Sequence, residues 1–161
     1  MKKYLWLLLI FSCIILCLSA NSQVVTLNYN IPSAMQIRVS RHAINLNLNW
    51  DRHLDSRLPA SVQVDSTYDI LCITTSPKRI LAKLEDRLPD RTTLRVTLHS
   101  PQNSGTSLGP VELIHNHPGQ PVVTGLNNVS ATNLLMLFEF SAEKEVMPGP
   151  GTARVTFTIT D

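Results

Sequence analysis

Hydrophobic and polar residues alternate one by one along several short segments of the chain. The first such segment has threonine or asparagine between its apolar side chains, which are Val25, Leu27, Tyr29 and Ile31. A period of two places successive side chains on opposite faces of an extended chain, so the pattern predicts a half-buried β-strand. The same pattern predicts further strands within residues 35–39, 44–50, 94–98 and 155–159. At 80–84 it favours a strand over a short helix.

Two longer stretches have few polar interruptions. Residues 68–75 and 134–140 are nearly continuous in apolar side chains. Short runs of this kind between turns are typical of strands buried on both faces or lying near the middle of a sandwich. Residues 51–60, by contrast, crowd charged side chains between two strand segments, and we expect a polar loop or a short helical turn there.

Proline and glycine separate the predicted strands at roughly ten-residue spacing. Examples are Ser76-Pro77, Gly109-Pro110 and the run 148–151. Regularly spaced short strands with such turns predict an all-β protein, and we expect an immunoglobulin-like antiparallel β-sandwich of roughly 7 to 9 strands.

The N-terminus has a different pattern. Lys2 and Lys3 precede an uncharged apolar run over residues 4–18, which is followed by small residues. This is typical of a secretory signal peptide, with cleavage after Ala20 or Ser22. We therefore expect a signal peptide at 1–22, a single domain at 23–161 with no membrane span, and a final location in the periplasm, on the outer cell surface or outside the cell.

Composition narrows the classes of function. The chain has 14 Lys and Arg against 12 Asp and Glu, and loss of Lys2 and Lys3 leaves the two signs balanced. A neutral chain without a basic block does not favour a nucleic-acid partner. Two of the three cysteines, Cys13 and Cys17, leave with the signal peptide. Cys72 then stands alone inside an apolar run, so we expect it to be a buried thiol rather than a nucleophile.

Candidate chemistry is sparse. His115 and His117 would point to the same face of a strand and could hold one metal ion, although two solvent-facing histidines at a strand end are the simpler interpretation. Asp65 and Asp69 offer carboxylates for acid–base chemistry. We find no glycine-rich phosphate loop, serine elbow or zinc-protease helix, and we expect no catalytic residue and no cofactor. The alternatives are a secreted metal-binding protein or hydrolase using His115 and His117, and a carbohydrate-binding module using Trp50 and Tyr68.

Three stretches together resemble the small exported β-sandwich domains of bacterial surfaces, of the chaperone–usher pilin and spore-coat-U type. They are the alternating segment 25–31, the unit 88–98 and the glycine-led, threonine-rich end 150–161. Many members of that group have paired cysteines in their first strands, which this chain lacks. The resemblance implies a structural or adhesive, pilus-like subunit that self-associates or meets a periplasmic chaperone and an usher. It also implies that residues 25–31 either complete their own sheet or insert into a neighbour's groove.

Overall fold

A computed structural model of the chain describes residues 26–28, 30, 32–48, 60–143, 146 and 149–161. The predicted signal peptide, Trp50 and the charged stretch 51–59 lie outside the described residues, as do Val25, Tyr29 and Ile31. The chain divides into two compact units, residues 1–31 and residues 32–161. In the first unit the described residues 26–28 and 30 are exposed and belong to no strand, so the half-buried strand predicted at 25–31 is wrong for its described part.

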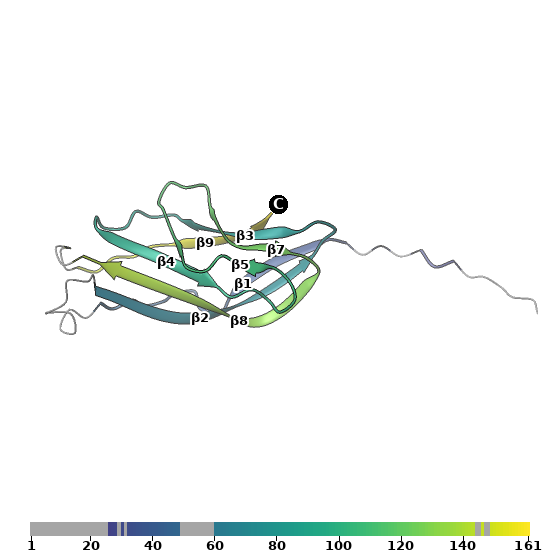
Figure 1. The fold of residues 1–161 in the computed structure, drawn as a ribbon, viewed down its shortest axis with the longest axis horizontal. Coiled ribbons are helices and arrows are strands. Elements are labelled where there is room, and N and C mark those ends of the chain that lie inside the picture. The colour runs from purple at the N-terminus through teal and green to yellow at the C-terminus, as the bar shows by residue number, and fades with distance from the viewer. Residues whose placement is uncertain (1–25, 29, 31, 49–59, 144–145, 147–148) are drawn as a thin grey trace, which may run out of the picture. The chain divides into compact units, whose positions relative to one another are not determined.

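The second unit is a β-sandwich of two antiparallel sheets (Figure 1). The described residues contain no helix. The first sheet has the order β1 (Ala34–Val39), β2 (Ala60–Ile73), β8 (Val129–Ala142), β4 (Thr92–Leu98) and β6 (Val111–Glu112). The second has the order β5 (Thr106–Ser107), β7 (Gln120–Leu126), β3 (Lys78–Leu84) and β9 (Val155–Thr160). The prediction of an all-β sandwich is confirmed.

The core lies between the two sheets and is built from every second residue of the long strands. Buried side chains come from both layers, and the largest of them include Tyr68, Ile70, Leu98 and Met136 in the first sheet and Ile80, Leu84, Val122 and Leu126 in the second. Each such aliphatic side chain stabilises the fold by about 1.5–3 kcal/mol when fully buried. Cys72 is also fully buried and unpaired, which confirms the prediction that it serves as a small core residue.

One extra residue in β8 keeps the apolar side chains of this strand facing the core. The pairing of β2 with β8 shifts between Tyr68↔Leu134 and Ile70↔Ala131, so β8 has a bulge at this point. Asn133 adopts a φ of 55°, a left-handed conformation that asparagine tolerates, and its N–H donates to Asp69 Oδ1 at 2.9 Å. The bulge moves the inward positions from odd numbers before it to even numbers after it.

Most predicted strands are present, and the differences have local causes. Strands cover 35–39, 80–84, 94–98 and 155–159 as expected, and the two apolar runs belong to β2 and β8, which are neighbours in the middle of the first sheet. Strand β7 is not anticipated by the alternation, because its side chains at 122 and 123 are both buried and Pro121 and Gly125 interrupt it. The strand predicted at 44–50 is wrong for its described part, because residues 44–48 pair with no strand.

Candidate functional site: an open seam between the sheets

The two sheets have their edges β1 and β9 on the same side of the sandwich, where these strands contact each other. Strand β9 pairs with β3 along residues 155–160, and no other strand in the described part of the chain pairs with it. The backbone N–H and C=O groups on its outer edge are therefore available to another strand.

Strand β1 covers only part of this side. Its pairing with β2 ends at Val39↔Tyr68, and Ser40 N–H donates to the carbonyl oxygen of Thr67 at 3.0 Å. From Arg41 onward the chain leaves the sheet, and residues 41–48 make no backbone hydrogen bond to any other described residue.

Residues 41–48 nevertheless keep the burial pattern of a strand. Ile44 and Leu46 are half-buried and pack against the core, whereas Asn45 and Asn47 are exposed. The alternation that predicts a strand here therefore sets which side chains face inward. What this segment lacks, among the described residues, is a partner strand.

A cavity of about 1190 Å³ separates residues 41–48 from residues 149–157, which lead into β9. We call this gap the open seam. Its floor is apolar and includes Leu94, Phe138, Phe140 and Phe157. The rings of Phe138 and Phe157 meet edge to face across the two sheets, with centroids 6.4 Å apart and planes at 71°. The floor therefore offers pockets for apolar side chains.

The charged side chains lining the open seam are cationic in the part of the chain that the structure describes. They are Arg41 and Arg87, with His42 as the titratable neighbour. Arg87 Nη2 donates to Asp90 Oδ1 at 2.8 Å, but both side chains are exposed, so the pair adds little stability. With no described carboxylate on the lining, a segment that is neutral or acidic can enter the seam without repulsion.

The wall formed by β9 is fixed at both of its ends. Asp86 accepts hydrogen bonds from Arg154 at the backbone N (2.9 Å), at Nε (3.0 Å) and at Nη2 (3.0 Å). These bonds hold the pKa of the Asp86 carboxyl below its usual value and raise that of the guanidinium. At the other end Lys78 forms an ion pair with Asp161. One edge of β9 is thus held on β3 while the other borders the seam.

The predicted histidine pair is not arranged as a metal site. Asn116 has a φ of 64°, so the chain turns between the two histidines and they do not share a strand face. His115 bridges to Leu84 and its Nδ1 is buried without a hydrogen-bond partner, while the exposed His117 accepts a hydrogen bond at Nδ1 from Gly119 N–H at 3.2 Å. The two histidines therefore lie on either side of a turn rather than along one strand.

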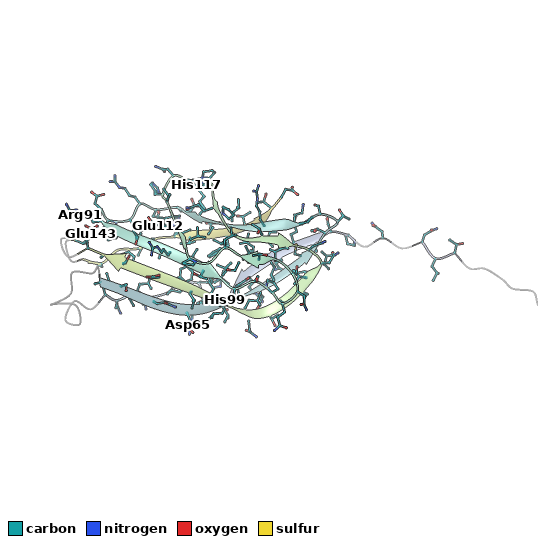
Figure 2. The ribbon with its side chains drawn as sticks, in the orientation of Figure 1. Asp65, Arg91, His99, Glu112, His117 and Glu143 are labelled. Atoms are coloured by element: carbon teal, nitrogen blue, oxygen red, sulfur yellow. The ribbon has the colours of Figure 1, made fainter. Side chains whose placement is uncertain are left out.

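The other candidate groups are scattered. Asp65 lies on the outer side of the first sheet, and Figure 2 shows Asp65 and His99 on the opposite side of the fold from His117. Asp69 caps the bulge in β8 and so has a structural partner. No group of three histidine, cysteine or acidic residues that could hold a metal occurs among the described residues.

Comparison of the chain with protein-family models, with curated proteins and with solved structures found no match. Within the described residues, no helix has the length and apolar character needed to cross a bilayer.

The sequence did not indicate the open seam. Its floor contains Phe138 and Phe140, which in the sequence are indistinguishable from ordinary core residues of an apolar run. Its walls depend on the topology, which leaves the outer edge of β9 and residues 41–48 without partner strands among the described residues. The signal that could have pointed to it is the strand pattern of residues 44–48.

Proposed function

We propose that this protein is an exported, non-enzymatic structural or adhesive subunit of a bacterial cell surface, and that copies of it join through the open seam. The observation that carries the proposal is the cavity with an apolar floor beside the outer edge of β9, which is unpaired among the described residues. A strand that adds to such an edge gains main-chain hydrogen bonds, and its alternate side chains fill the pockets.

The segment 25–31 has the properties that the seam requires. It contains no charged residue, it alternates apolar and small polar side chains, and Pro32 ends it. Leu27 is 81% exposed, so its apolar side chain is available to a groove. Insertion of this segment into a groove would cover Leu27 together with Val25, Tyr29 and Ile31.

The length of the segment favours a neighbouring copy as the receptor. Strand β1 begins at Ala34, at the far end from Val39, which is the first residue that lines the seam. A chain that folds back at Pro32 and Ser33 must first run beside β1 for about 17 Å before it reaches Val39. That distance uses up all but the first two residues of 25–31, so Leu27, Tyr29 and Ile31 reach the seam of a second copy but not their own.

Specific observations weaken the two alternatives. A carbohydrate-binding surface needs exposed aromatic rings, but Tyr68 is fully buried and its hydroxyl donates to the carbonyl oxygen of His99 at 2.6 Å. A metal site on His115 and His117 is disfavoured by the turn at Asn116. The cavity, at about 1190 Å³, also exceeds the roughly 300–1,000 Å³ typical of small-molecule pockets.

A charge-matched pair of variants tests the proposal. Leu27→Asp with Tyr29→Asp places charges on the face that enters the seam, whereas Thr26→Asp with Asn28→Asp places the same charges on the opposite face. We expect the purified wild-type protein and the Thr26/Asn28 control to form oligomers by sedimentation velocity. The Leu27/Tyr29 variant should stay monomeric with an unchanged melting temperature.

Two outcomes would contradict the proposal. If the wild-type protein remained monomeric at all concentrations, the proposed self-association would be wrong. A Leu27/Tyr29 variant that melts at lower temperature as a monomer would show that the segment belongs to its own sandwich. The resemblance also implies a periplasmic chaperone as a partner, and we expect such a protein to co-purify with the Leu27/Tyr29 variant.

A further inference from the structure

A second, smaller hollow lies on the outer face of the first sheet, which is the face away from the core. Its volume is about 190 Å³, and its lining comes from three neighbouring strands, β1, β2 and β8. The polar lining residues and the largest apolar one that faces outward are Gln36, Arg38, Asp69, Leu71, Ser130 and Thr132. None of them lines the open seam, so this hollow, which we call the outer pocket, is a separate site.

The register of the three strands produces the outer pocket. Gln36 pairs with Leu71 and Arg38 pairs with Asp69. The even-numbered residues at this end of β2 are buried in the core, so strand alternation turns these four side chains outward. On the other side of β2, the short Ser130 stands opposite Leu71, just before the bulge in β8. Long side chains from β1 and short ones from β8 therefore enclose a hollow above β2, with Leu71 as its apolar floor.

The outer pocket contains a cation and an anion that do not neutralise each other. Arg38 and Asp69 are register partners, a relation that places Cβ atoms about 4.5–5.5 Å apart. No ion pair joins them, and Arg38 makes no hydrogen bond to another residue in the described part of the chain. Asp69 accepts the N–H of Asn133 at Oδ1, which leaves Oδ2 without a partner among the described residues. A guanidinium and a carboxylate oxygen are thus both available to a ligand.

This pair of charges narrows the class of ligand. A simple anion is repelled by Asp69, and a simple cation is repelled by Arg38. A neutral sugar gains no attraction from either charge, and no aromatic ring lines the outer pocket for it to stack on. The volume is also below the roughly 300–1,000 Å³ that is typical of pockets for drug-sized ligands. The ligand that fits is small and carries both signs of charge.

We propose that the outer pocket binds the zwitterionic α-amino-carboxylate group of a small amino acid. Arg38 donates to the carboxylate, for which the planar guanidinium offers two parallel N–H groups. Asp69 accepts from the ammonium group at Oδ2. The side chain of the amino acid faces Leu71, and the neutral amide and hydroxyl groups of the lining complete the polar contacts. This site goes beyond the proposed function, because it shares no lining residue with the open seam.

Nuclear magnetic resonance with L-alanine as the probe tests the proposal. The ¹⁵N-labelled protein carries Leu27→Asp and Tyr29→Asp, which remove the proposed self-association. L-alanine should shift the amides of residues 36–38, 69–71 and 130–132, with a dissociation constant on the order of 1–10 mM, because the contacts are few and exposed to solvent. L-alaninamide lacks the carboxylate and N-acetyl-L-alanine lacks the ammonium. Each should bind at least 10-fold more weakly than L-alanine.

Two charge-removing variants identify the contacts. Arg38→Gln and Asp69→Asn should each weaken the binding of L-alanine at least 10-fold. Asparagine keeps an oxygen that can accept the N–H of Asn133, so the bulge in β8 should remain. The matched controls are Arg95→Gln and Asp65→Asn, which remove the same charges from exposed positions on the same outer face and should leave binding unchanged.

A steric variant gives a measurement that does not depend on charge. Ser130 is exposed, so Ser130→Leu should fill the outer pocket without disturbing the core and should abolish binding of L-alanine.

Three results would overturn the proposal. The first is the absence of localised shifts at L-alanine concentrations 10-fold above the expected dissociation constant. The second is equal binding of L-alanine and its two analogues, or binding of D-glucose in their place. The third is unchanged binding in both Arg38→Gln and Asp69→Asn. None of these results bears on assembly through the open seam, which sedimentation velocity measures separately.

Discussion

Cys72 shows how far a single residue can be predicted from its neighbours. An isolated cysteine in an apolar run with no nearby base is expected to be buried, and its side chain is fully buried in β2. The hydrogen bond of Tyr68 could not be anticipated in the same way. Its hydroxyl donates to the carbonyl oxygen of His99, and only the fold brings these two groups together.

Substitution of Cys72 by serine should lower the free energy of unfolding by about 1–3 kcal/mol, because a hydroxyl enters an apolar layer without a partner. Chemical denaturation of the two proteins measures this difference. The native thiol should also react slowly with a thiol reagent, whereas a cysteine placed at the exposed Asn45 in a Cys72→Ala background should react at once. Fast labelling of native Cys72 with no loss of stability would show that the residue is accessible.

Tyr68 predicts a loss of stability at alkaline pH. Burial raises the pKa of its phenol to about 12, so between about pH 10 and 12 the unfolded chain loses this proton while the folded chain keeps it. The contribution of the neutral phenol to the free energy of unfolding is complete below pH 10. It decreases as the pH rises, by roughly 3 kcal/mol at most. Tyr68→Phe should cost about 1–2 kcal/mol at neutral pH, since His99 loses its donor. The stability gap between wild type and variant should narrow above pH 10; a constant gap would argue against the buried neutral phenol.

At the scale of elements, the period of two predicted most strands because alternation reflects burial of one face. It could not reveal that residues 44–48 have no ladder partner, since pairing depends on where β1 leaves β2 and on which strand forms the opposite edge. It also missed β7, in which adjacent residues Val122 and Val123 are both buried.

The Asp86–Arg154 contact should control the start of β9. Asp86→Asn removes the ion pair, so amide exchange at residues 154–157 should become faster while the remainder of β9 stays protected. The pKa of the Asp86 carboxyl in the folded protein lies below its ordinary value of 3.8. The contribution of this carboxylate to stability is therefore present at neutral pH and is lost as the pH falls through the pKa of the folded state. Asp90→Asn is the control, because the partner of Asp90 among the described residues is the exposed Arg87, and this substitution should leave exchange in β9 unchanged. If amide exchange at residues 154–157 were the same in both variants, Asp86 would not hold the start of β9 in place.

At the scale of the whole molecule, each copy offers one open seam and one segment 25–31, which are different surfaces. An interface between two different surfaces is heterologous, and it continues from copy to copy unless the rotation closes a ring. The proposed assembly is therefore a filament or a ring rather than a symmetric dimer. The fold class could be predicted from local alternation. The polarity of the assembly follows instead from the topology, in which the described residues leave one seam, lined by 41–48 and 149–157.

Mixing two defective variants tests that polarity. The Leu27→Asp, Tyr29→Asp protein keeps an intact seam but has no functional segment, whereas Leu46→Glu places a charge on the lining of the seam and keeps the segment. Each variant alone should be monomeric, and an equimolar mixture should form dimers and nothing larger, because one copy only donates and the other only accepts. Sedimentation velocity measures the sizes, and Ala153→Trp, at an exposed position on the cavity wall, replaces Leu46→Glu if that variant melts early. Monomers in the mixture would overturn strand exchange between copies, and growth of the mixture beyond dimers would overturn the one-seam, one-segment arrangement.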